Sequence, residues 1–87
     1  MNEYDESVLR AFLKMQYDIF DEEMASSLEE AEEFLEDCLA VVCDDIKEVR
    51  AYFEEEGTDL YGMNDRELAE SEEVHELPDG RFLILEI

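Results

Sequence analysis

The charge of this chain limits the folds that it can adopt. Twenty-eight Asp and Glu residues stand against six Lys and Arg residues, so the formal net charge is −22. Self-repulsion at that density opposes compaction, so a folded state needs a substantial core. Hydrophobic residues make up 46% of the sequence and include four Tyr and five Phe, which is too apolar for a disordered acidic segment. One small folded domain is therefore expected over residues 1–87.

The charge also excludes classes of partner. Nucleic acids and anionic membrane surfaces both require clustered Lys and Arg, which this chain lacks. A basic protein surface, metal ions, simple solubility or a saline environment are left as explanations. No apolar run approaches the length of a membrane span, and the segment from Met1 to Glu6 is acidic where a signal peptide is basic. A cytoplasmic protein is expected.

Helical spacing of apolar residues predicts a first helix over residues 6–22, capped by Asp5 or Ser7. A short third helix is expected over residues 65–72, where Leu68 points inward. Both helices present acidic residues on their remaining faces. They are therefore expected to pack as amphipathic helices of a globular domain.

The strongest helical pattern lies in the middle of the chain. Ser27 and Glu30 have the spacing of a capping box, which marks a helix start. Apolar positions then step by three and four from Leu28 to Phe53, and Gly57 is a typical residue just beyond a helix end. The sequence predicts one continuous helix over this stretch, about 43 Å long.

The last part of the chain changes to a β pattern. Residues 74–77 and 81–87 flank Pro78-Asp79-Gly80, which has the composition of a tight turn. The second of these segments is apolar on both faces from residue 82 onward, which is typical of a strand covered on both sides. The predicted fold is α+β: two antiparallel amphipathic helices, a short third helix and a C-terminal β-hairpin.

A hairpin of two strands is only marginally stable and would leave an apolar edge open. A symmetric partner could cover that edge together with the apolar stripe that the long helix leaves exposed. This reasoning predicts a homodimer with Phe82, Ile84 and Ile87 at its interface.

Few residues suggest catalysis. His75 is a lone histidine in a predicted strand, and Cys38 and Cys43 lie on one predicted helix where they cannot form a disulfide. Glu72 and His75 form one Glu-x-x-His pair, whereas carboxylate di-iron bundles need two. The glycines form no phosphate-binding motif. No catalytic residue, cofactor site or metal site is predicted, and the protein is not expected to be an enzyme.

An acidic helix face is the remaining candidate site. Carboxylates one helical turn apart are separated by about 5–6 Å, close to the spacing of phosphates along a nucleic-acid strand. Such a face would bind a basic protein. The residues predicted to form it are Glu29, Glu33, Glu36, Asp37, Asp44 and Glu48.

In composition and size the chain resembles small phage and mobile-element proteins that block restriction or CRISPR nucleases, although the resemblance covers no motif. It implies an acidic inhibitor or adaptor that occupies the nucleic-acid groove of a basic protein. Two other hypotheses stay open: an immunity protein or antitoxin against a basic toxin, and a structural homo-oligomer whose charge only keeps it soluble.

Crowding of the carboxylates is expected to affect stability as well. Neighbouring negative charges should raise carboxyl pKa values in the folded state. A raised pKa makes the fold more stable as the pH falls toward it. Moderate acid is therefore predicted to stabilise the protein.

Overall fold

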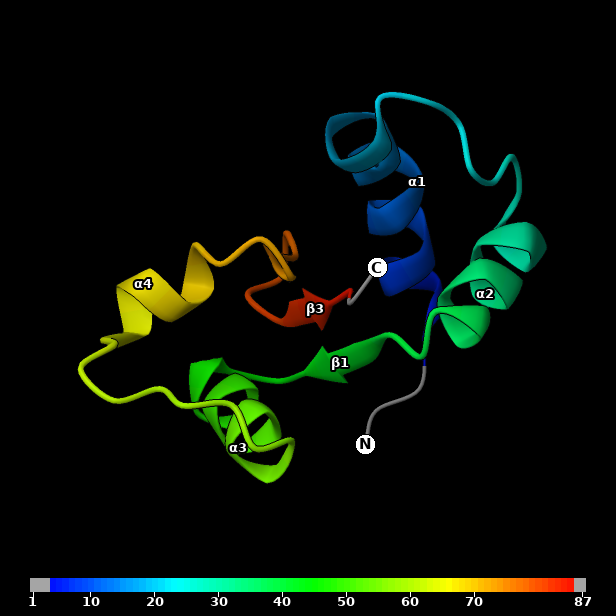
Figure 1. The fold of residues 1–87 in the computed structure, drawn as a ribbon. Coiled ribbons are helices and arrows are strands. Elements are labelled where there is room, and N and C mark those ends of the chain that lie inside the picture. Colours follow the sequence, from blue (N-terminus) through cyan, green and yellow to red (C-terminus); the bar gives the residue numbers. More distant parts are fainter. Residues whose placement is uncertain (1–3, 86–87) are drawn as a thin grey trace.

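The structure, a computed structural model, describes residues 4–85 and has an α+β fold, as predicted. In Figure 1, α1 lies beside α2 at one end of the molecule, and α3 lies near α4 at the other. Within the described residues, no helix combines the length and apolar character that a membrane span requires. The helices are α1 (Glu6–Phe20), α2 (Leu28–Asp37), α3 (Ile46–Glu55) and α4 (Asp65–Ala69), and the strands are β1 (Val41–Cys43), β2 (Val74–Glu76) and β3 (Phe82–Ile84).

The three strands of the described residues form one antiparallel sheet in the order β1-β3-β2. The turn Pro78-Asp79-Gly80 joins β2 to β3, and the Gly80 N–H donates to the Leu77 carbonyl at 3.0 Å. Gly80 has a φ of 92°, which glycine adopts without strain. The predicted C-terminal hairpin is therefore confirmed, but β1 is a third strand that the sequence pattern did not predict.

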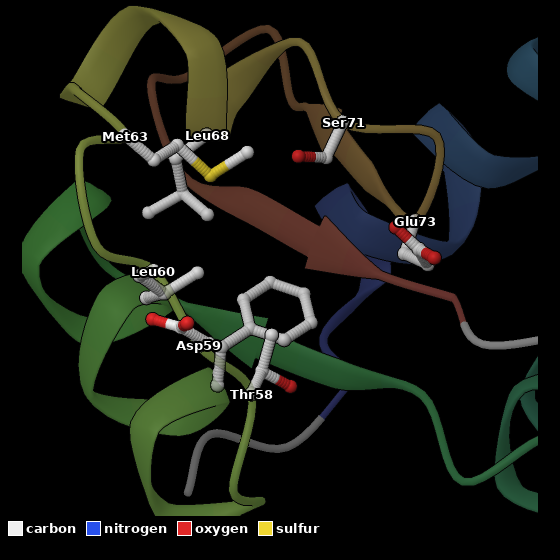
Figure 2. A pocket seen from close by; sticks show the side chains of 8 residues that line it. Thr58, Asp59, Leu60, Met63, Leu68, Ser71 and Glu73 are labelled. Carbon is white, nitrogen blue, oxygen red and sulfur yellow. The ribbon is translucent and has the colours of Figure 1, made fainter.

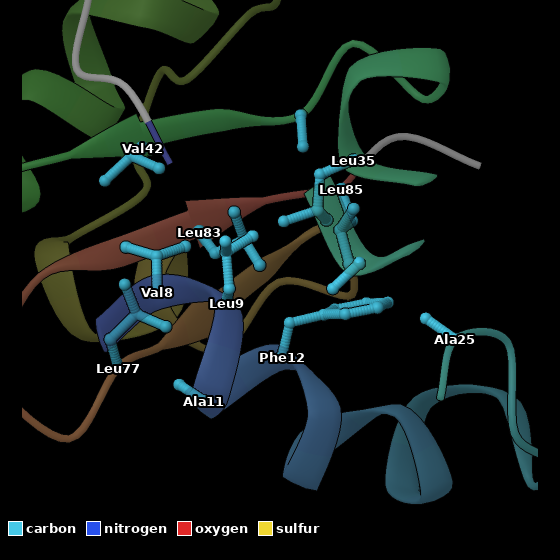
Figure 3. Packing of buried hydrophobic residues seen from close by; sticks show 12 residues of the cluster. Val8, Leu9, Ala11, Phe12, Ala25, Leu35, Val42, Leu77, Leu83 and Leu85 are labelled. Carbon is cyan, nitrogen blue, oxygen red and sulfur yellow. The ribbon is translucent and has the colours of Figure 1, made fainter. Parts of the chain in front are cut away.

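Both faces of this sheet are covered by helices. Neighbouring residues of a strand point to opposite faces of the sheet. Val42 and Leu83 therefore belong to the hydrophobic core on one face, and their neighbours along β1 and β3 belong to the core on the other face. The first core includes Val8 and Phe12 of α1, which Figure 3 shows beside Leu83. The prediction that the last strand is covered on both sides is thereby confirmed. The second core, on the side of α3 and α4, contains Val41, Cys43, Val49, Phe53, Leu68, Val74, Phe82 and Ile84.

A buried glutamine fastens the connection between α1 and α2. Gln16 is 1% exposed, and its Oε1 accepts hydrogen bonds from the N–H groups of Met24 at 2.7 Å and Ala25 at 2.9 Å. Its Nε2 donates to the Ala25 carbonyl at 3.0 Å. Nearby, the rings of Phe12 and Phe34 stack with their centroids 5.4 Å apart. The Gln16 amide thus supplies hydrogen bonds to the backbone of Ala25, the buried residue of this connection.

Two predicted helices agree with the structure apart from their last residues. Asp5 caps α1, because its Oδ1 accepts from the Val8 N–H at 2.9 Å. Asn64 and Glu67 form a full capping box at the start of α4. The helices end at Phe20 and Ala69, two and three residues before the predicted ends.

The prediction of one continuous helix after residue 27 is wrong. α2 ends at Asp37, and the chain turns at Leu39, which has a left-handed φ of 57°. The Leu39 N–H donates to Glu36 at 3.1 Å, and the Ala40 N–H donates to Leu35 at 2.9 Å. These two bonds form a Schellman motif, which ordinarily has glycine where Leu39 stands.

Strand pairing explains why the helix stops. Val41–Cys43 is buried on both faces of the sheet and pairs with β3. This pairing and burial stabilise a strand, and the helical spacing of apolar residues cannot reveal them. A new helix then begins at Asp45, whose Oδ1 accepts from the Glu48 N–H at 3.0 Å. The predicted stop at Gly57 is confirmed, with a φ of 85°.

The homodimer was predicted from a two-stranded sheet with an open apolar edge, which the described part of the structure does not have. The sheet has a third strand, and the chain's own helices cover both faces. Phe82 and Ile84 are 9% and 1% exposed, so they lie inside the protomer and not on its surface. Ile87 lies outside the described residues. A homodimer stays a prediction, but these residues no longer argue for it.

Candidate binding surfaces

The exposed side of α2 carries the first four of the predicted site residues. Glu29, Glu33, Glu36 and Asp37 are all exposed, and we call this set the α2 acidic face. The opposite side of the helix is buried in the first core. Because α2 is amphipathic and packs by one side only, these carboxylates are held together in solvent.

No basic residue lies near the α2 acidic face in the sequence. Between Lys14 and Lys47 the chain contains no Lys, Arg or His, although it contains many Asp and Glu residues. Glu30, on the same helix, accepts through Oε1 from the N–H and the Oγ of Ser26, both at 2.8 Å. Its role is therefore to hold the helix start. The neighbouring carboxylates stay available to a partner.

Asp44 and Glu48 belong to a different place. They lie at the start of α3, which is separated from α2 by β1. There the Asp44 N–H donates a hydrogen bond to the Glu48 Oε1 at 2.9 Å. Glu48 is thus part of the helix start, as Glu30 is in α2. The six predicted residues therefore form two separate groups and not the single rod that a continuous helix would give.

Carboxyl pKa values respond to these local hydrogen bonds. Hydrogen bonds from the Arg81 side chain and from the Val8 N–H lower the pKa of Asp5. Hydrogen bonds from the Ser26 N–H and hydroxyl lower the pKa of Glu30, and bonds from Arg81 lower the pKa of Asp79. The prediction that crowding raises carboxyl pKa values is wrong for these three groups, because donated hydrogen bonds favour the charged form.

Exposed apolar side chains accompany the acidic surfaces. Leu39 is 80% exposed and follows the α2 acidic face directly. Tyr61 is 96% exposed in the segment between α3 and α4. Tyrosine is enriched among the residues that anchor protein interfaces and leucine is not, so Tyr61 is the stronger candidate anchor of the two.

A cavity of about 390 Å³ lies between the end of α3, α4 and the segment that joins them. Figure 2 shows Leu60, Met63, Leu68 and Asp59 on one side of it and Ser71 and Glu73 on the other. The remaining lining residues are Phe53, Thr58 and Ser71. Sequence reasoning missed this cavity because most of its residues come from connecting segments, which have no periodicity; only Gly57 and Gly62 marked the loop.

The lining divides into an apolar and a polar part. Phe53 and Leu68 are almost completely buried, at 7% and 1% exposed. Asp59 and Glu73 are exposed, and no basic side chain lines the cavity among the described residues. The Asp59 Oδ1 accepts from the Tyr61 N–H at 2.9 Å, which places this exposed tyrosine at the same loop.

The residues with catalytic chemistry lie apart from one another. Cys43 is a free thiol on β1, and burial followed by the charge of Glu48 raises its pKa to about 11. Cys38 is also a free thiol and stands at the end of α2. The prediction that both cysteines lie on one helix is wrong, because Cys43 lies on β1. Burial raises the pKa of the Cys38 thiol as well. Neither cysteine has the low pKa of a reactive thiolate.

His75 lies on β2, as predicted, and lines a second cavity of about 450 Å³ with Asp18, Ile19, Glu73 and others. Burial lowers its pKa, and the charge of Glu73 acts against that shift. Within residues 4–85, no three His, Cys, Asp or Glu side chains are grouped so that they could hold a metal ion.

Comparison with known proteins gives no further guide, since no family model, curated protein or solved structure matches this chain.

Proposed function

We propose that this protein binds a basic protein surface through the α2 acidic face and blocks that surface, as an inhibitor or adaptor. The observation that carries the proposal is the unbalanced charge of this helix and its surroundings. If each of the six basic side chains paired with a different carboxylate, the chain would still carry its net charge of −22. That charge must be balanced from outside, by salt or by a partner.

The geometry of α2 favours a surface that ordinarily binds phosphates. Glu33 lies about one helical turn from Glu29, and Glu36 and Asp37 lie about one turn beyond Glu33, which gives roughly 5–6 Å between Cβ atoms of residues one turn apart. A helix of ten residues is about 15 Å long, so this face matches a short stretch of nucleic acid. The break at Leu39 removes the longer rod that residues 28–56 would have formed. The proposed partner is therefore a protein with a nucleic-acid groove, of which this face occupies a part.

Binding of this kind depends on salt and on particular carboxylates. We would immobilise the protein, add a cell extract at low salt, and identify the proteins that are released as the salt rises. The triple variant Glu29→Lys, Glu33→Lys, Glu36→Lys is expected to lose the salt-sensitive partner, mainly through slower association. An excess of duplex DNA should displace the partner from the unaltered protein.

The matched control is Glu55→Lys, Glu70→Lys, Glu76→Lys, which changes the net charge equally at exposed residues outside α2. Loss of the partner by the α2 variant alone supports the proposal. Equal loss by both variants shows that only net charge matters and contradicts it. A partner that duplex DNA cannot displace contradicts the nucleic-acid groove as the target.

A further inference from the structure

The cavity between α3 and α4 combines two features that select one kind of ligand. Its interior is formed by Phe53, Leu60, Met63 and Leu68, which offer only apolar atoms from their side chains. A ligand that fills it must therefore have an apolar body. At about 390 Å³ the cavity is near the lower end of the range of ligand pockets, roughly 300–1,000 Å³, so it has room for one long side chain and the backbone beside it.

The polar groups at the edge of the cavity are acceptors. The Oδ1 atom of Asp59 accepts a hydrogen bond from the Tyr61 N–H at 2.9 Å, and the carboxylate has a second oxygen, Oδ2, that can accept from a ligand. Ser71 donates its hydroxyl to the Glu67 carbonyl at 3.4 Å, so its oxygen can accept from a ligand. Glu73 adds a second carboxylate. A ligand with positively charged N–H donors suits these groups.

Other ligand classes fit less well. An anion would face two carboxylates with no basic side chain from the lining. A purely apolar ligand would shield carboxylates from water without giving them donors. A metal ion would find only two carboxylates, fewer than the ligand number of Ca²⁺ or Mg²⁺ sites. Lys and Arg side chains combine an apolar stem with a cationic head, which is the combination that this lining requires.

We propose that this cavity receives a Lys or Arg side chain from an extended segment of the basic partner, with the stem against Leu60, Met63 and Leu68 and the head at Asp59. Glu73, on the other side of the cavity, adds to the negative potential that attracts the head. The inference rests on the function proposed above, since it assigns a second contact to the same partner. Tyr61, 96% exposed and linked to Asp59 by its N–H, lies beside the cavity as an aromatic contact for the same segment.

The probe for this site is a short capped peptide with one central lysine between glycines. Its counterpart has norleucine in place of lysine, which keeps the stem and removes the charge. We would titrate each peptide into the protein and follow the methyl signals of Leu60, Met63 and Leu68 by NMR, with those of Val8 and Leu83 in the other core as internal reference. The lysine peptide should shift the cavity methyls saturably, and the norleucine peptide should bind about tenfold more weakly, which corresponds to one charge-assisted contact.

The double variant Asp59→Asn, Glu73→Gln keeps the shape of both side chains and should weaken the lysine peptide about tenfold. Its control, Glu55→Gln, Glu76→Gln, removes the same charge outside the cavity and should leave binding within about twofold. Methyl and amide spectra of the free variants verify that each is folded. Shifts limited to acidic surface amides, equal binding of both peptides, or equal weakening by both variants would overturn the proposal.

The two proposals fail in different ways. Failure of the α2 charge reversal to release the partner counts against the proposed function, whatever the peptide does at the cavity. Loss of the partner on α2 reversal together with unmoved methyls of Leu60, Met63 and Leu68 overturns the cavity proposal alone.

Discussion

Arg81 and Asp5 join the two ends of the fold: the Nη1 atom of Arg81 lies 2.9 Å from the Oδ2 atom of Asp5, across a sequence separation of 76 residues. Arg81 also binds Asp79 in its own turn, with 2.7 Å between Nη2 and Oδ2. Asp5 at the same time caps α1 through Val8. One carboxylate thus holds a helix start and the β2–β3 turn together.

Two substitutions separate these roles of Asp5. Asp5→Asn keeps a good helix cap and loses only the ion pair, so it should lower the free energy of unfolding by less than about 1 kcal/mol. Asp5→Ala loses both and should cost about 1–2 kcal/mol. Thermal unfolding of the two variants at low salt makes the comparison. Equal losses would show that the cap contributes nothing and would contradict this assignment.

Gln16 should be among the least replaceable polar residues of the described chain. Gln16→Leu fills a similar volume but leaves the N–H and carbonyl of Ala25 and the N–H of Met24 without their partner. Burial of an unsatisfied backbone group costs about 1–3 kcal/mol, so the variant should lose about that amount or more. Denaturant unfolding measures the loss, with Gln16→Glu as the variant that keeps the acceptors. A Leu variant as stable as the unaltered protein would contradict the role of the side-chain amide.

The elements predicted correctly are those whose signals are local. Asp5 and Asn64 mark helix starts by capping chemistry, and Pro78-Asp79-Gly80 marks a turn by its allowed φ angles. The break at Leu39 had no such signal, because leucine is not expected in a left-handed conformation. It is imposed by pairing of β1 with β3, a contact between distant segments.

Two signals in the sequence could have revealed more of this region. Asp45 followed by Glu48 has the spacing of a helix start, and Val41 and Val42 are β-branched residues directly before it. The regular apolar spacing from Leu28 onward favours a helix through these positions and masks both signals. The exposure of Glu29, Glu33, Glu36 and Asp37 agrees with the prediction, because it depends on one short helix. Their continuation to Asp44 and Glu48 along the same helix was wrong. The α3–α4 cavity was not predicted, because it depends on how a loop folds back over a core.

Leu39 offers a direct test of the α2 terminus. It occupies the left-handed position of the Schellman motif and is 80% exposed, so it loses little contact when truncated. Leu39→Gly should raise the free energy of unfolding by about 1 kcal/mol, because glycine has no Cβ to strain this conformation. Leu39→Ala, which keeps the Cβ, is the control and should show no such gain. A Gly variant no more stable than the Ala variant would mean that the Cβ causes no strain at this position and would contradict the prediction.

Loss of stability in mild acid is expected from His75. Burial lowers its folded-state pKa below the ordinary value near 6.5, against the opposing charge of Glu73 and beside the carboxylates of Glu72 and Asp18 in the same cavity. The unfolded chain then binds a proton more readily than the folded chain does. The stabilisation that a neutral His75 provides is therefore complete above the unfolded pKa and is lost as the pH falls through the folded value.

The lowered pKa values of Asp5, Glu30 and Asp79 act in the same direction but at lower pH, because their contribution is present above the unfolded carboxyl pKa and is lost as the pH falls through the folded values. Between about pH 7.5 and pH 5.5 the histidine is consequently the group to test. As the pH is lowered over this interval, the change in Tm should be less favourable for the unaltered protein than for His75→Gln. Both proteins carry the same acidic residues, so subtracting one Tm curve from the other removes the effect of the net negative charge. Parallel Tm curves for both proteins would show that His75 is not the group responsible, and a steeper fall in the variant would reverse the sign of the argument.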